Sequence, residues 1–254
     1  MHANKVTPGR TRRRVSYLGH ATALIELDGA RLLTDPLLRR RVAHLVRTSS
    51  PPDPPEIDAV LISHGHLDHL DLPSLERLPR TTPIVVPAGL GRLVRSRGFQ
   101  SVSEVEAGDE IAVADITVRA TPADHPGRPA PGRSAQAVGY SVLGSGRVYF
   151  AGDTDLFDGM AGLVEQLDIA LLPIWGWGPS LGTGHLDPGR AAEALALLAP
   201  RLAVPIHWGT LRPFYRTPRA HYLREPVDAF VAAARELAPG VAVRVLAPGE
   251  SLGF

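Results

Sequence analysis

The segment Ser63-His64-Gly65-His66-Leu67-Asp68-His69 places three histidines and an aspartate close together, and it decides how the chain is interpreted. It follows the apolar run of residues 59–62, which predicts a buried strand. In an extended backbone, residues two apart point to the same side, so His64 and His66 can bind one metal ion. The chain then turns, which lets Asp68 and His69 face a second ion. Imidazole and carboxylate ligands suit zinc, with iron and manganese as alternatives. The segment therefore predicts a metal site.

The composition of the 254-residue chain predicts a globular protein with a large hydrophobic core, because 44% of the residues are hydrophobic. The net charge of +1 gives no general field that favours nucleic acid, so no nucleic-acid partner is expected. Cysteine is absent, which leaves histidines and carboxylates to hold any metal. Neither a signal peptide nor an apolar run of membrane-spanning length is evident. We therefore expect a cytoplasmic protein without a transmembrane segment.

The order of predicted elements indicates two packed sheets. Residues 1–14 are polar and basic and predict a flexible tail, and residues 15–254 predict a single domain. Strand patterns occur in both halves and alternate with helical ones, which favours two sheets with helices outside. Strands are predicted at residues 15–18, 23–27, 31–33, 57–62, 84–86, 101–105, 110–113, 116–120, 137–142, 148–151, 169–172, 203–206 and 241–246. Helices are predicted at residues 75–78, 90–97, 188–198 and 226–237.

A further short helix is predicted between Leu38 and Arg47. Leu38, Val42 and Leu45 recur at spacings of four and three, the period of one helix face. Arg39, Arg40, Arg41 and Arg47 share the segment, so it is expected to pack on the domain as an amphipathic helix.

A site for two ions needs more ligands than the first segment supplies, and three later residues can provide them. His125 follows the predicted strand at 116–120, and Asp153 follows the one at 148–151. His207 follows the strand at 203–206. Polar residues at the ends of buried strands are typical of an active-site rim, because loops carry function on a rigid scaffold. A Gly- and Trp-rich loop, residues 173–184, is expected to form a wall of the same pocket.

With the motif His-x-His-x-Asp-His at residues 64–69, the chain resembles the metallo-β-lactamase fold superfamily. Within it, the chain is most similar to the branch of N-acylphosphatidylethanolamine phospholipase D and the ascorbate-6-phosphate lactonases. The stretches that carry this resemblance are Leu18-Gly19-His20-Ala21-Thr22, Leu33-Thr34-Asp35-Pro36, Phe150-Ala151-Gly152-Asp153-Thr154, Gly184-His185-Leu186-Asp187-Pro188 and Ile206-His207-Trp208-Gly209-Thr210.

The resemblance implies an α/β fold, an αββα sandwich of two mixed sheets flanked by helices. It also implies a set of seven metal ligands: His64, His66 and His125 for the first ion, Asp68, His69 and His207 for the second, and Asp153 for both. Asp35 and His20 would lie behind these ligands and orient them by hydrogen bonds. The implied cofactors are two Zn²⁺ ions, with Mn²⁺ or Fe²⁺ as alternatives.

The activity implied by the resemblance is that of a dinuclear zinc-dependent hydrolase, in which a metal-bridging hydroxide attacks phosphorus or a carbonyl carbon. A phosphodiesterase of the phospholipase D kind is favoured. The alternative is a lactonase or other carbonyl hydrolase of the ascorbate-6-phosphate lactonase type, using zinc or manganese. A di-iron oxygen or nitric oxide reductase is disfavoured, because those relatives typically have Glu where His66 stands.

Four residues receive roles in this reaction. His185 and Asp68 are assigned to catalysis, His185 as the proton donor to the leaving group. Trp175 and Trp177 are expected to bind apolar parts of the substrate. The expected partner is a small-molecule or lipid-like ester, and a homo-oligomer is left open.

Overall fold

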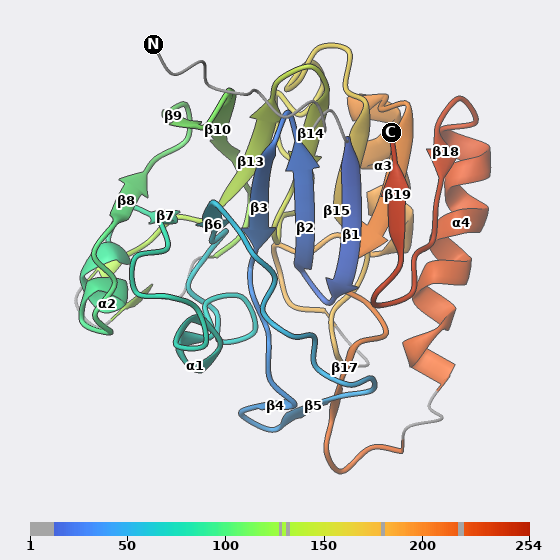
Figure 1. Ribbon diagram of the computed structural model, residues 1–254. Coiled ribbons are helices and arrows are strands. Elements are labelled where there is room, and N and C mark those ends of the chain that lie inside the picture. Colours follow the sequence, from blue (N-terminus) through green and yellow to red (C-terminus); the bar gives the residue numbers. More distant parts are fainter. Residues whose placement is uncertain (1–12, 127–128, 131–132, 179–180, 218–220) are drawn as a thin grey trace.

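Two large β-sheets lie face to face in the computed structural model, which describes residues 13–126, 129–130, 133–178, 181–217 and 221–254 (Figure 1). Both sheets mix parallel and antiparallel pairs. In spatial order, the first sheet contains β19 (Ser251–Gly253), β1 (Arg14–Gly19), β2 (Thr22–Leu27), β3 (Ala30–Thr34), β6 (Ala59–Leu61), β7 (Ile84–Pro87) and β8 (Val102–Val105). The second contains β18 (Ala242–Val243), β16 (Leu202–Ile206), β15 (Ile169–Pro173), β14 (Arg147–Phe150), β13 (Val138–Leu143), β10 (Ile116–Pro122) and β9 (Glu110–Val113).

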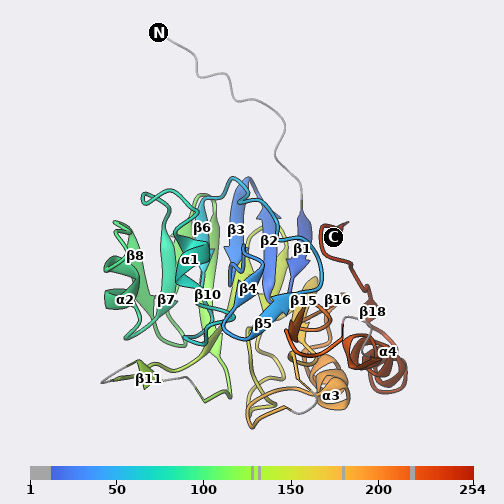
Figure 2. The same cartoon turned by 90° about the horizontal axis from the view of Figure 1, so that it is seen from below.

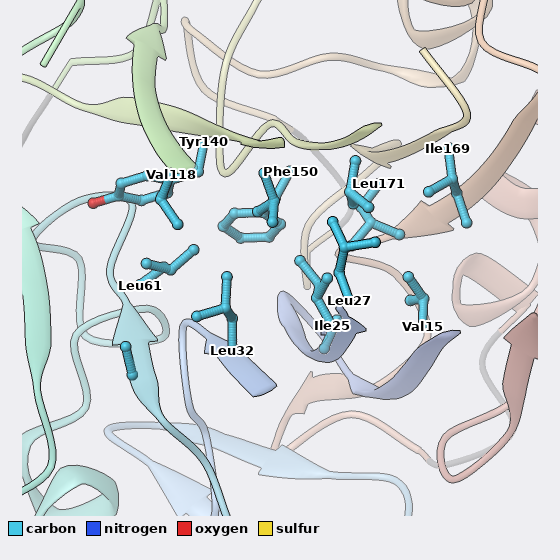
Figure 3. Close-up of a cluster of buried hydrophobic side chains, with 14 of the residues drawn as sticks. Val15, Ile25, Leu27, Leu32, Leu61, Val118, Tyr140, Phe150, Ile169 and Leu171 are labelled. Carbon is cyan, nitrogen blue, oxygen red and sulfur yellow. The ribbon is translucent and has the colours of Figure 1, made fainter. Parts of the chain in front are cut away.

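The main hydrophobic core lies between the two sheets (Figure 3). Alternate side chains of each strand point to one face, and the inward ones are apolar. Figure 3 shows Ile25 and Leu32 of the first sheet opposite Phe150 and Leu171 of the second. Phe150 is fully buried, as are the other three.

Helices cover the outer faces of both sheets (Figure 2). The helices α1 (Leu72–Leu75) and α2 (Gly91–Arg95) pack on the first sheet through a separate apolar cluster. On the second sheet, α3 (Pro188–Leu198) and α4 (Glu225–Leu237) pack through another. The predicted αββα sandwich is therefore confirmed. None of the helices in the described residues is long and apolar enough to cross a membrane.

Local sequence signals explain several of these elements. Asp28 and Gly29 have positive φ angles of 49° and 86° in the β2–β3 hairpin, as a tight Asp-Gly turn requires. The α3 helix begins after Asp187, whose carboxylate accepts a hydrogen bond from the backbone N–H of Arg190. Its observed bounds, Pro188–Leu198, are those predicted.

The helix predicted between Leu38 and Arg47 is wrong, because this segment forms a β-hairpin. The strands β4 (Arg41–Val42) and β5 (Leu45–Arg47) pair with each other, and β5 also pairs with β17 (Leu211–Pro213). Ala43 takes a positive φ of 46° in the turn. Val42 and Leu45 lie opposite each other and bury their side chains with Leu37 and Leu211. Figure 1 shows this small sheet below the lower edge of the sandwich.

Smaller differences concern the ends of the chain and minor elements. Of the predicted 241–246 strand, Ala242–Val243 alone forms β18, and the unpredicted β19 pairs with β1. The predicted tail falls at residues 1–14, of which residues 1–12 lie outside the described residues. Two short strands, β11 (Pro129–Ala130) and β12 (Arg133–Ser134), and the 3₁₀-helix η1 (His221–Leu223) complete the described elements.

Candidate metal centre

The predicted ligands meet at one edge of the sandwich because each follows the carboxyl end of a strand. In the first sheet, His20 follows β1, Asp35 follows β3, and the segment 63–69 follows β6. These strands run in the same direction, as their pairing shows. In the second sheet, the residues are His125 after β10, Asp153 after β14 and His207 after β16. The centre is therefore built from both sheets.

The structure brings these side chains into two groups that can each hold a metal ion. In each group, one nitrogen or oxygen atom of every residue lies within 4.8 Å of the others. The first group comprises His64, His66, His125 and Asp153. The second group comprises His20, Asp68, His69 and His207.

Three histidine nitrogens converge in the first group. His66 Nδ1 lies 2.9 Å from His64 Nε2 and 3.1 Å from His125 Nε2. Asp153 Oδ2 lies 3.8 Å from His64 Nε2, on the side that faces the second group. This arrangement brings together three imidazoles and one carboxylate, a donor set that suits zinc.

The second group faces Asp153 as well. His69 Nε2 lies 3.0 Å from His207 Nε2 and 3.2 Å from Asp153 Oδ2. The other oxygen of Asp153, Oδ1, lies 3.3 Å from His207 Nε2. Asp68 Oδ2 lies 3.9 Å from His69 Nε2 and 3.8 Å from His207 Nε2. Asp153 is therefore placed to be shared between the two groups.

For three of the histidines, hydrogen bonds from behind fix which nitrogen points into the centre. His125 Nδ1 donates to the carbonyl oxygen of Gly184 at 2.7 Å, and His207 Nδ1 donates to that of Trp175 at 2.6 Å. His69 Nδ1 lies 2.7 Å from Asp35 Oδ2. With Nδ1 protonated, the neutral form of each of these three rings presents the lone pair of Nε2 to the centre.

Asp35 contacts the second group directly and the first group through Ser63. The Ser63 hydroxyl donates to Asp35 Oδ2 at 2.6 Å, and its oxygen lies 3.0 Å from His64 Nδ1. The backbone N–H of Ser63 donates to Asp35 Oδ1 at 2.7 Å. The fully buried Asp35 therefore orients His69 directly and His64 through a hydroxyl.

These contacts fit metal ions. His69 Nε2 and His207 Nε2 lie 3.0 Å apart, a distance at which two neutral Nε2 lone pairs need a proton or a cation beside them. Asp153 Oδ1 is buried and accepts no hydrogen bond from the described residues. Buried polar atoms are normally paired, so convergent lone pairs and an unpaired carboxylate oxygen match the ligand shell of divalent cations.

The protonation states also fit. Burial lowers the pKa of His20 to about 3 and that of His125 to about 4, so both rings are neutral. Burial opposes ionisation of Asp153, but the imidazoles of His207 and His69 hold its pKa well below the usual range. Burial also opposes charge on His69, yet Asp153 and Asp35 raise its pKa well above the ordinary value. The carboxylates thus favour positive charge where a metal ion would lie.

His20 lies closer to the centre than a purely structural residue would. Its Nε2 is 2.9 Å from Asp68 Oδ2, and its ring packs on that of His207 with centroids 3.9 Å apart. His20, Asp35 and His207 all have positive φ, at 58°, 33° and 62°. Left-handed backbone at residues other than glycine is strained and gathers at functional sites.

A pocket of about 430 Å³ opens over the centre. His185 lines it, with Nε2 3.5 Å from Asp153 Oδ2 and Nδ1 3.1 Å from the carbonyl oxygen of Gly182. Burial opposes protonation of His185, but its hydrogen bond to Asp153 raises its pKa above the ordinary value. Trp177 also lines the pocket. His185 and Trp177 are therefore positioned to contact a substrate bound in the pocket.

Trp175 differs from the prediction. Its indole packs against the apolar cluster under α3 and α4, outside the lining of the pocket, and its carbonyl oxygen holds His207 instead. Sequence reasoning missed the supporting role of Ser63, although its place before His64 was a signal. It also missed His44, which enters the pocket wall through the unpredicted hairpin.

Comparisons with known proteins agree with this geometry. A family model described as "Beta-lactamase superfamily domain" matches residues 30–208. A UPF0173 metal-dependent hydrolase of Methanopyrus kandleri is 33% identical over 246 residues, covering 94% of this chain and 98% of that protein. N-acyl-phosphatidylethanolamine-hydrolyzing phospholipase D 1 of Caenorhabditis elegans is 30% identical over 243 residues, covering 84% of this chain and 67% of that protein.

A solved structure shows the same fold. The di-iron β-hydroxylase CmlA of Streptomyces venezuelae superposes with a TM-score of 0.75 at 22% identity, covering 98% of this chain and 55% of that one. At this identity the likeness concerns the fold alone. The family match and the similar hydrolases show that the chain belongs to the metallo-β-lactamase superfamily and is a metal-dependent hydrolase.

Proposed function

We propose that the chain is a dinuclear zinc-dependent phosphodiesterase of the phospholipase D kind. The observation that carries this proposal is the pair of ligand groups beneath an open pocket, with the Asp153 carboxylate facing histidines of both. The similarity to the worm phospholipase D supports phosphorus as the reacting centre. Zinc is favoured over magnesium because five of the seven ligands are imidazoles, and Mn²⁺ or Fe²⁺ are the alternatives.

The residues assigned to the ions are those predicted from the sequence. His64, His66 and His125 would hold the first ion, Asp68, His69 and His207 the second, and Asp153 would contact both. When bound, such ions lower the pKa of a coordinated water and polarise a substrate oxygen. The chain itself fixes the imidazoles through Asp35, Gly184 and Trp175, so that their lone pairs stay directed inward.

His185 is assigned the transfer of a proton to the leaving oxygen. Its ring lies in the pocket wall, with 21% of its side chain exposed, and Nε2 points to the side where Asp153 lies. Its Nδ1 is occupied by the carbonyl oxygen of Gly182, so Nε2 is the atom that can serve a substrate. A positioned group of this kind contributes about 10²–10⁴-fold to the rate.

The second candidate is a lactonase or other carbonyl hydrolase that uses the same ligands, with manganese as an alternative to zinc. The donor set itself does not distinguish phosphorus from a carbonyl carbon. The pocket disfavours a phosphorylated sugar lactone as the substrate. No Lys or Arg that could bind the sugar phosphate is among the described residues that line the pocket.

One comparison of substrates tests the proposal. Protein loaded with zinc, and separately with manganese, is assayed on bis(4-nitrophenyl) phosphate, 4-nitrophenyl phosphate and γ-butyrolactone. We expect the phosphodiester to be hydrolysed fastest. The Asp153→Ala variant, purified and loaded in the same way, controls for contaminating enzymes. Turnover of the lactone with none of the phosphodiester would establish the second candidate instead.

A further inference from the structure

Two chemically different sets of side chains line the pocket over the metal centre. One set consists of four assigned metal ligands and His185. The other set is apolar and comes from the β4–β5 hairpin, from the loop that follows β15 and from the segment after β6. Its side chains are Val42, Ala43, Leu45, Leu67, Trp177 and Leu181, which we call the apolar wall.

The apolar wall offers very little for a polar substrate to bind. Among the described residues that line the pocket, none is Lys, Arg, Ser, Thr, Asn, Gln or Tyr. Apart from the assigned metal ligands and His185, the described lining offers side-chain hydrogen-bonding groups on His44 and on the indole N–H of Trp177. A substrate rich in hydroxyl or phosphate groups would lose its hydration here without gaining partners, which is unfavourable.

Trp177 holds a defined position in this wall. It packs against the buried cluster of Leu37, Val42, Leu45 and Leu211. The ring of His44 meets it edge to face, with centroids 4.9 Å apart and an angle of 79° between the planes. Because β5 is paired on both sides, by β4 and β17, the surface under Trp177 is already formed without a ligand.

The volume of the pocket, about 430 Å³, lies in the range for small-molecule sites. It is large enough for a reacting group at the ligand side together with an apolar group at the wall. A preformed apolar surface binds without the cost of ordering mobile side chains.

We infer that the apolar wall is a specificity site, and that the substrate is an ester carrying an uncharged apolar chain or ring. Trp177 and the β4–β5 turn bind this group, and phosphorylated sugars are poor substrates. The inference rests on the proposed function in that the assigned metal ligands hold the reacting group.

Binding of alkylphosphonates tests the inference apart from turnover. Methyl-, butyl- and octylphosphonate are titrated calorimetrically into the zinc-loaded protein. Affinity is expected to rise with chain length, by up to about fourfold for each methylene that becomes fully buried. Glucose 6-phosphate, which offers a phosphate on a hydroxyl-rich body, is expected to bind no more tightly than methylphosphonate.

Two variants locate the effect. Trp177→Ala should flatten the dependence on chain length while leaving methylphosphonate affinity unchanged. Ala43→Asn adds a polar amide to the exposed turn, where Asn tolerates the positive φ of 46°. It should therefore also flatten the dependence while leaving the melting temperature unchanged. Phe214→Ala is the control, because Phe214 is 55% exposed beside the same hairpin but does not line the pocket.

The outcomes separate this inference from the proposed function. Equal affinity for all three phosphonates, or tighter binding of glucose 6-phosphate than of octylphosphonate, would overturn the specificity site. An equal chain-length dependence in wild type, Trp177→Ala and Ala43→Asn would overturn it as well. If the dependence is present but phosphodiesters are not hydrolysed, the specificity site stands and the phosphodiesterase proposal fails.

Discussion

At the scale of single residues, the centre depends on carboxylates with different neighbours. Asp153 is buried between the two ligand groups, and its Oδ1 lacks a hydrogen bond from the described residues. Asp155, two residues later, already binds Arg190 through Oδ1 at 2.6 Å. The two side chains are therefore assigned different tasks, although they share one turn and one residue type.

Asp153→Ala is expected to lower metal affinity by more than about 100-fold. Loss of a residue that only supports a ligand costs up to about 100-fold, and loss of an assigned ligand should cost more. The physical reason is that its carboxylate contacts both groups. Competition with a chromophoric chelator measures the affinity. Asp155→Ala is the matched control and should keep it within a fewfold of wild type. The assignment of Asp153 is wrong if Asp155→Ala loses the metals while Asp153→Ala keeps them.

His185→Ala is expected to keep both ions and lower turnover by about 10²–10⁴-fold. Loss of a proton donor matters most for a poor leaving group, so the effect should be larger on an alkyl phosphodiester than on a nitrophenyl one. Steady-state kinetics on the two substrates gives the ratio. An equal loss on both would remove the proton-donor role, and loss of metal would make His185 a ligand.

At the scale of elements, loops hold the ligands by their backbone. The Gly184 carbonyl accepts the Nδ1 proton of His125, and Gly184 has a φ of 79°. A Cβ atom at this position would lie 2.4 Å from Pro126 Cδ and 3.0 Å from His125 Cα. A side chain there would therefore press on the ligand-bearing turn that Gly184 supports.

Gly184→Ala is expected to weaken metal binding by about 10–100-fold, the range for disturbing a partner of a ligating histidine. It should also destabilise the fold by about 1–3 kcal/mol, because alanine is strained at positive φ. Gly182→Ala, in the same loop, is the control, since its Cβ would meet nothing closer than 4.0 Å. Chelator competition and thermal unfolding measure both effects. Equal behaviour of the two variants would contradict this account of the loop.

The elements also show what could be predicted from the sequence. Strands such as β2 and β14 were predicted because their residues form short apolar runs, and α3 because a cap, a proline and a helical period agree. The segment between Leu38 and Arg47 was predicted wrongly, because spacings of three and four also suit a hairpin with one face buried. Its partner β17 lies more than 160 residues away, and local patterns carry no information about such a pairing.

The site shows the same limit. The assigned metal ligands were predicted because motif residues follow the ends of strands, where loops commonly carry binding and catalytic residues. The pocket position of His44 and the packing of the Trp175 indole against the cluster under α3 and α4 could not be predicted, since both depend on how the hairpin and the loop after β15 pack.

At the scale of the whole molecule, the assigned metal ions would join the two sheets. His64, His66 and His69 come from the first sheet, whereas His125, Asp153 and His207 come from the second. The core between the sheets is apolar, so the ligand edge is where convergent polar atoms replace apolar packing. Metal binding should therefore contribute to the stability of the sandwich as well as to its chemistry.

Metal removal is expected to lower the melting temperature by about 10 °C or more. At a free metal concentration of 100 times Kd, each bound ion adds about 2.7 kcal/mol to the free energy of unfolding. A change of 1 kcal/mol shifts the melting temperature of a domain of this size by about 2–4 °C. Calorimetry after dialysis against a chelator or against zinc measures the difference. The shift should be much smaller in Asp153→Ala. Equal melting temperatures of the metal-free and zinc-loaded wild type would contradict the linkage.

The central claim is that one chain binds two transition-metal ions through the residues assigned above. Elemental analysis of wild-type protein, reconstituted with zinc and freed of unbound metal, tests it most directly, with the protein concentration taken from amino-acid analysis. His185→Ala is treated in parallel as a control. It lacks the pocket histidine that is not an assigned ligand, so it shows whether His185 itself holds a zinc ion. We predict two zinc ions per chain in both proteins. One ion or fewer per wild-type chain would contradict the dinuclear centre.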